Sequence, residues 1–243
     1  MLNRALGINS QLGSRTLRIG YSQIGRGCVF NFIGEHAVGS TLIDRSRNRV
    51  AATLNGAVND QFKNGRWELN FDGVDDFVSY RTPVLSLITI SLWFKLDVLT
   101  YPNGHRMMVS AGPNAGGAGY ISTSVLNKGG PYVSMRIGGV QRTLDSQNPA
   151  NSTNSTVGIW YHTAVTWDGS NIKIYHNGIL KNTSATFSGA LSGWDTGTGT
   201  IGKYVAAAGY ECDGKLADVR IYNIPLSALQ INQIYNETKN LYT

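Results

Sequence analysis

Cysteine, charged residues and long apolar runs are scarce in this sequence. The shortages of cysteine and of long apolar runs each exclude a class of protein. No apolar run approaches the ~20 residues that a membrane-crossing helix needs. The start, MLNRALGINSQLGSRTLRIG, lacks the apolar core of a secretory signal peptide. Two cysteines, Cys28 and Cys212, are too few for a disulfide scaffold. We predict that they are small buried thiols, with a bridge between them as the alternative.

Basic charge is concentrated at one end of the chain. The first 30 residues contain no acidic residue and four arginines, Arg4, Arg15, Arg18 and Arg26. This pattern predicts a basic N-terminal arm, residues 1–27, that docks on an acidic partner surface. A solvated tail without a partner is the alternative interpretation. Nucleic acid is disfavoured as the partner, because no zinc-ligand spacing, helix-turn-helix or RNP-type motif accompanies the arginines.

Alternation of apolar and polar residues dominates the sequence from Cys28 onward and predicts β-strands. ITISLWFKLD places Ile90, Leu92 and Phe94 on one face, and WYHTAVTWDGSNIKIYHNG reads as two strands joined at Asp168-Gly169. About a dozen such short segments, separated by turns rich in Gly, Ser and Asn, favour a β-sandwich or barrel. Residues 28–243 are therefore predicted to form one all-β domain.

One short helix is predicted near the C-terminus, in PLSALQINQIYNE. Ser227 can cap its first turn, and Gln230 can complete a capping box. Leu226 and Ile231 have the spacing of a hydrophobic staple. Ile231, Ile234 and Tyr235 then share one face.

Four segments in the same order resemble one known family. They are VGSTLIDRSRNRVAATLNGA, LNFDGVDDFVSY, the strand pair ITISLWFKLD and WYHTAVTWDGSNIKIYHNGIL, and GKLADVRIYNIPLSALQINQIY. The chain from Cys28 to Tyr235 thus resembles the laminin-G-like, concanavalin-A-like lectin/glucanase jelly rolls. The resemblance implies a two-sheet antiparallel jelly-roll sandwich with one short C-terminal helix. Relatives on this fold bind carbohydrate or protein, or cut polysaccharides, so the fold alone leaves the function open.

The resemblance implies a pattern of carboxylates for hydrolases on this fold, and this sequence does not contain the complete pattern. Enzymes on this fold carry Glu-x-Asp-x-x-Glu on one strand, which aligns the acid and the nucleophile. The chain has four glutamates, and only Glu211-Cys212-Asp213 begins the pattern, with Leu216 in the last place. We therefore predict a protein that is not an enzyme, with no catalytic residues.

A structural calcium ion is the one cofactor that the resemblance implies. The matching ligands are Glu35, Asp44 and Asp218, since calcium prefers several oxygen ligands. Arg45, Arg47 and Arg49 surround Asp44 in the sequence, so salt bridges in place of the ion remain the alternative.

A second acidic cluster, Asp72-Gly73-Val74-Asp75-Asp76, has a simpler explanation than a metal. Asp72-Gly73 begins a turn between two strands, and the carboxylates of Asp75 or Asp76 can accept backbone N–H bonds across it. We therefore expect a turn.

Carbohydrate binding needs aromatic side chains near polar groups in a concave site. Trp194 lies in the glycine-rich loop LSGWDTGTG, and Tyr204 and Tyr210 follow it in another loop region. These three are the candidate ligand-binding residues.

A jelly roll without an export sequence fits one setting well. We hypothesise a virion protein, made in the host cytoplasm and released by lysis: a capsid decoration or a tail-associated adhesin. The arm would dock it on neighbouring capsid subunits, the outer surface would contact a cell-surface glycan, and a homo-oligomer is compatible with this role. The alternatives are a lectin-like carbohydrate-binding protein, extracellular by a non-standard route, and, third, a glycoside hydrolase.

Overall fold

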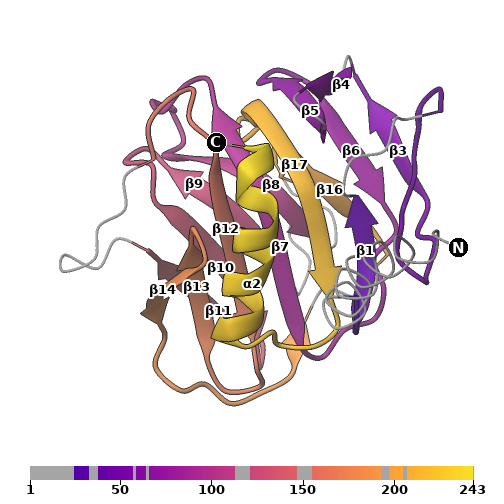
Figure 1. The fold of residues 1–243 in the computed structure, drawn as a ribbon. Helices are drawn as coiled ribbons and strands as arrows, with labels where there is room; N and C mark the ends of the chain where they lie inside the picture. Colours follow the sequence, from indigo (N-terminus) through magenta and orange to yellow (C-terminus); the bar gives the residue numbers. More distant parts are fainter. Residues whose placement is uncertain are drawn as a thin grey trace, which may run out of the picture.

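The computed structural model shows two antiparallel β-sheets packed face to face, with one helix on the outside (Figure 1). It describes residues 25–32, 38–56, 59–63, 66–112, 121–146, 155–192, 197–204 and 207–242. The architecture is the predicted jelly-roll sandwich. Most of the basic arm, including Arg4, Arg15 and Arg18, lies outside the described residues, as do Glu35 and Trp194.

Sheet A has eight strands, and its strand order places segments from both ends of the chain side by side. The order is β14 (Ile179–Thr183), β13 (Ile172–His176), β12 (Tyr161–Trp167), β7 (Ile88–Leu96), β17 (Asp213–Tyr222), β5 (Arg66–Asp72) and β4 (Asn59–Lys63), with β1 (Cys28–Phe32) also paired to β17.

Strand β17 pairs with two different strands along one edge. Its first half, Asp213–Leu216, pairs with β5, and its second half, from Val219, pairs with β1. Its other edge pairs with β7 along both halves. Asp218 lies between the halves with a positive φ of 50°, at an irregularity of the β7 register. This local kink redirects the strand from one neighbour to the next.

Sheet B has nine strands and forms the second layer. The order is β11 (Val140–Asp145), β10 (Pro131–Ile137), β9 (Ile121–Leu126), β8 (His105–Ala111), β16 (Gly199–Ile201), β6 (Phe77–Tyr80), β3 (Ala52–Asn55) and β2 (Thr41–Leu42), with β15 (Leu191–Ser192) paired to β10.

The core lies between the sheets and follows the predicted alternation. Ile90, Leu92 and Phe94 of β7 are all buried there, together with Val133 and Met135 of β10. Since successive side chains of a strand point to opposite faces, the residues between them belong to the outer faces.

Helix α2 (Ala228–Thr238) covers the outer face of sheet A (Figure 1). Ser227 and Gln230 form the predicted capping box, and Ile231 and Ile234 are buried with Leu226. The short 3-10 helix η1 (Lys239–Leu241) follows. Beneath this end of the chain the ring of Trp93 stacks on Tyr242, with centroids 4.4 Å apart. No helix in the described part of the chain is both long and apolar enough to span a membrane.

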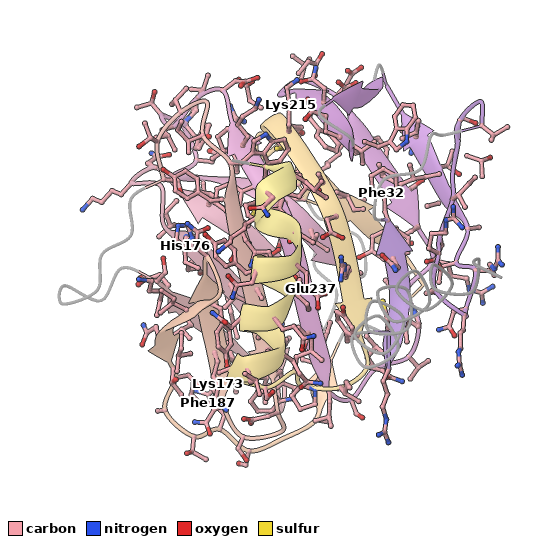
Figure 2. All side chains as sticks on the ribbon, viewed as in Figure 1. Phe32, Lys173, His176, Phe187, Lys215 and Glu237 are labelled. Carbon is pink, nitrogen blue, oxygen red and sulfur yellow. The ribbon has the colours of Figure 1, made fainter. Side chains whose placement is uncertain are left out.

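The tight turns contain the residues that their backbone requires. The β13–β14 turn has positive φ at Asn177 and Gly178, as two-residue hairpin turns demand. Asp168 Oδ1 accepts backbone bonds from Ser170 and Asn171. Lys173 lies at the lower end of its strand in Figure 2, with its Nζ 2.7 Å from Asp168 Oδ2. Both cysteines are free thiols; Cys212 is buried, as predicted, whereas Cys28 is half-buried.

Candidate functional site

The outer face of sheet B carries a continuous row of small hydroxyl side chains. Strand by strand, each member lies directly opposite the next, and all point away from the core. We call this row the hydroxyl ladder: Thr41, Thr53, Ser79, Thr200, Ser110, Ser122, Ser134 and Thr143.

A pocket of about 230 Å³ lies toward the β11 end of the ladder. We call it the tyrosine pocket. Its lining combines aromatic rings with polar groups: His105, Met107, Ser122, Tyr132, Ser134, Gln141, Tyr204 and Tyr210. Four strands supply six of these residues, and the segment after β16 supplies the two remaining tyrosines.

The rings of the tyrosine pocket hold one another in place through edge-to-face contacts. The His105 ring lies 5.5 Å from Tyr132 and 5.0 Å from Tyr210, with interplanar angles of 83° and 82°. Tyr204 meets Tyr210 at 5.5 Å and 75°. Such perpendicular arrangements are favourable because the ring edge is positive and its face negative.

The backbone of the loop also fixes Tyr210. Its carbonyl oxygen accepts a hydrogen bond of 2.9 Å from the N–H of Met107, on the neighbouring β8. Just before it, Gly209 donates to Glu211 Oε2 and accepts a bond from Asn103 Nδ2. The pocket is therefore supported by a sheet on one side and an anchored loop on the other.

The polar groups of the pocket are partly engaged with one another. Gln141 Nε2 donates to Ser134 Oγ at 3.1 Å, and His105 Nδ1 lies 3.0 Å from Ser124 Oγ. Burial lowers the pKa of His105 below its ordinary value, so the imidazole is neutral at pH 7. No Asp or Glu belongs to the described lining.

Of the three predicted ligand-binding residues, the structure brings two together. Tyr204 and Tyr210 both line the pocket, whereas Trp194 lies outside the described residues. His105, Tyr132 and the serines of the lining were not predicted from the sequence. Only the register of β8, β9 and β10 unites them, and no local motif marks that register.

Two of the three predicted calcium ligands, Asp44 and Asp218, have protein partners, and the third, Glu35, lies outside the described residues. Asp44 accepts four hydrogen bonds, from the N–H groups of Asn31, Ser46 and Val50 and from Ser46 Oγ. Asp218 forms a two-pronged salt bridge with Arg220, at 2.7 and 2.9 Å. These carboxylates fit a calcium ion poorly, since their oxygens already accept bonds. The arginine that pairs with Asp218 is Arg220, and not one of those around Asp44.

The acidic cluster at residues 72–76 forms the predicted turn. Asp72 Oδ1 accepts from Val74 N at 2.8 Å, and Asp76 Oδ2 accepts from Asp72 N at 3.1 Å. Carboxylate oxygens of Asp72, Asp75 and Asp76 lie within 4.8 Å of one another. Backbone N–H groups thus donate hydrogen bonds to two of these three carboxylates, those of Asp72 and Asp76.

Comparison with known families identifies the class of protein. A model of the concanavalin A-like lectin/glucanases superfamily matches residues 72–232, so the chain belongs to that superfamily. A comparison with curated protein sequences finds no match.

Several solved toxin domains share the fold. The binding domain of Paraclostridial Mosquitocidal Protein 1 has a TM-score of 0.69 at 15% identity, covering 90% of this chain and 54% of that one. The botulinum neurotoxin serotype D binding domain has a TM-score of 0.65 at 14% identity, covering 90% and 53%. A botulinum neurotoxin type C structure has 0.64 at 16%, covering 89% and 52%. The chain thus spans about half the length of these structures, and the likeness defines the fold.

Proposed function

We propose that the chain is a carbohydrate-binding protein that holds a sugar ring in the tyrosine pocket. The observation that carries this proposal is the combination of four rings with serine hydroxyls and a glutamine amide in one hollow. Sugars present apolar C–H faces and a rim of hydroxyls. A site that offers aromatic faces beside hydrogen-bonding groups is complementary to both features.

A neutral ligand suits this pocket better than a charged one. The described lining contains neither a carboxylate nor a guanidinium, and the His105 imidazole is neutral at pH 7. The hydroxyl ladder continues from the pocket across the sheet. At its other end a second hollow includes Thr53 and Ser79. Ser110 and Thr200, between the two hollows, are buried, so further sugar units of a longer chain would meet ladder hydroxyls at Thr53 and Ser79.

Binding is favoured over hydrolysis by the distribution of carboxylates. Hydrolysis of a glycosidic bond needs two carboxyl groups flanking the bond. Glu211, the nearest in sequence, is 5% exposed and accepts a bond from Gly209 N. We infer that the protein binds its sugar without cutting it.

The related toxins give further support for a glycan ligand. Cell entry of botulinum neurotoxin type C depends upon interaction with two ganglioside molecules. Gangliosides carry an oligosaccharide, so a cell-surface glycan is the ligand class that we propose for this chain as well. The virion setting, the docking arm and a homo-oligomer remain predictions.

A glycan array followed by calorimetry tests the proposal. We expect neutral or neutral-terminated oligosaccharides among the ligands that the full chain selects, and Tyr210→Ala to weaken the best neutral ligand about tenfold or more. Tyr210→Phe is the matched control, because it keeps the ring and should retain most of the affinity. An array without selective binding, or a Tyr210→Ala variant with unchanged affinity, would overturn the proposal.

A further inference from the structure

A second, larger pocket opens at the β1 edge of sheet A. Its volume is about 560 Å³, and it lies between the start of β1, the loop after Asp44 and the end of β17. We call it the arginine pocket. Its polar side chains are three arginines and three asparagines, Arg26, Arg45, Arg47, Asn31, Asn48 and Asn223, beside Ser46 and Cys28.

The pocket concentrates positive charge without a carboxylate in its described lining. The one acid within the adjoining loop, Asp44, is 4% exposed, and its two oxygens accept four hydrogen bonds. The Asp44 carboxylate therefore stabilises the conformation of the loop. The exposed side chains of Arg45 and Arg47 lie beside the pocket. Within the described chain, Arg26 and Arg47 form no ion pair.

The asparagines add neutral hydrogen-bonding groups, and one of them lacks a partner. Asn31 Oδ1 is buried and accepts no hydrogen bond in the structure, although the Asn31 backbone N–H donates to Asp44. Buried polar atoms without a partner are uncommon in folded proteins. Because Asn31 Oδ1 is itself buried, the exposed side chain of Asn48 is the more accessible amide of this pocket.

We propose that the arginine pocket binds an anionic sugar. Guanidinium groups form paired, charge-assisted hydrogen bonds with a sulfate ester or a carboxylate, and amides bind sugar hydroxyls. The pocket has room for a monosaccharide unit. Its described lining contains no aromatic ring, so these residues offer no platform for stacking the base of a nucleotide.

The Cys28 thiol in this lining does not act as a nucleophile. Burial raises its pKa to about 12, so the thiol is protonated and a poor nucleophile at neutral pH. The arginine pocket is accordingly a binding site.

The arginine pocket is independent of the tyrosine pocket. The two share no lining residue, and they belong to different sheets. Each can therefore be tested with the other intact, and the failure of one proposal leaves the other standing.

Calorimetry with paired probes tests the inference on the full chain. One pair is a sulfated heparin-derived disaccharide and its desulfated form, and the other is sialyllactose and lactose. In the Tyr210→Ala background, which weakens binding at the tyrosine pocket, we expect the charged member of at least one pair to bind and its neutral partner not to bind. The pair that responds shows whether the recognised group is a sulfate or a carboxylate. Affinity should also fall as salt is raised.

Variants locate the bound probe. Arg26→Gln and Arg47→Gln should each weaken the charged probe about tenfold, because each removes a charge-assisted contact. Asn48→Ala, an exposed position, should weaken it less. Lys128→Gln removes the same charge from an exposed turn elsewhere and should leave the affinity unchanged. Tyr210→Ala should also leave it unchanged.

Three results would overturn the inference. One is equal affinity for charged and neutral probes. Another is unchanged affinity in both arginine variants, with circular dichroism confirming that they are folded. The third is a single-stranded DNA oligonucleotide that binds in the arginine pocket more tightly than either charged sugar.

Discussion

At the residue scale, two buried histidines make stability depend on pH. Burial, with Arg220 and His176 nearby, lowers the pKa of His162 to about 3, and burial with Lys181 nearby lowers that of His176 to about 4. Figure 2 shows His176 at the end of β13. His162 Nε2 lies 2.9 Å from Ser91 Oγ, a contact that suits a neutral ring.

The sign of the pH effect follows from these depressed values. Between pH 6.5 and about 4 the unfolded chain binds protons at these histidines more readily than the folded chain. Stability is therefore fully present above pH 6.5 and is lost as pH falls. We expect each histidine to cost about 2 kcal/mol of unfolding free energy between pH 7 and pH 5.

Urea unfolding at several pH values measures this loss. His176→Gln should reduce the slope between pH 7 and pH 5 by about half. His105→Gln, at a half-buried ring, serves as the control and should change the slope less. An unchanged slope in His176→Gln would contradict the assignment.

Gly178 is a residue where backbone and packing both exclude a side chain. Its φ is +76°, and a Cβ there would lie 3.0 Å from Tyr235 Cβ on helix α2. We expect Gly178→Ala to lower the unfolding free energy by roughly 2 kcal/mol or more. Gly104→Ala is the matched control, since its φ is +84° but nothing lies within 4 Å of the added carbon. Equal losses in thermal unfolding would show that the contact with the helix contributes nothing.

At the scale of elements, the helix depends on its cap. Ser227 Oγ accepts from Gln230 N, and the Gln230 side chain accepts from Ser227 N. Ser227→Ala should cost about 1 kcal/mol in urea unfolding. Ser188→Ala, at an exposed serine outside the helix, should cost almost nothing. A Ser227→Ala loss no larger than that of Ser188→Ala would show that the cap is dispensable.

The Asp44 loop makes a prediction about calcium. Because the carboxylate already accepts four hydrogen bonds, calcium added after EDTA treatment should leave the melting temperature unchanged. Asp44→Ala should lower the unfolding free energy by roughly 3 kcal/mol with or without calcium. A calcium-dependent rise in melting temperature that disappears in Asp44→Ala would support the predicted calcium site.

Local elements could be predicted from sequence because each depends on neighbouring residues. The Ser227–Gln230 box, the Asn177-Gly178 turn and the alternation of β7 all lie within a few positions. The sites could not be predicted in full, because they depend on register between distant strands. Arg26 and Arg47 line one pocket only because the loop after Asp44 bonds to β1, and Tyr132 and Tyr210 line the other only because His105 on β8 lies between them.

At the scale of the whole molecule, the two pockets are separate sites on one rigid sandwich. The tyrosine pocket lies on the outer face of sheet B, and helix α2 covers much of the outer face of sheet A (Figure 1). A mixed glycan with neutral and acidic parts has two distinct places to bind. The double variant Tyr210→Ala/Arg47→Gln should therefore lose affinity for the neutral probe by the same factor as Tyr210→Ala alone, and for the charged probe by the same factor as Arg47→Gln alone.

The position of β17 in the sequence also determines when the protein can fold. This strand holds together β1, β5 and β7, yet the ribosome makes it after all three. Until Asp213–Tyr222 emerges, the earlier strands have open edges that invite association with other nascent chains. Assembly of sheet A must wait until β17 has been made, and a polypeptide stalled before Asp213 should be digested rapidly by protease.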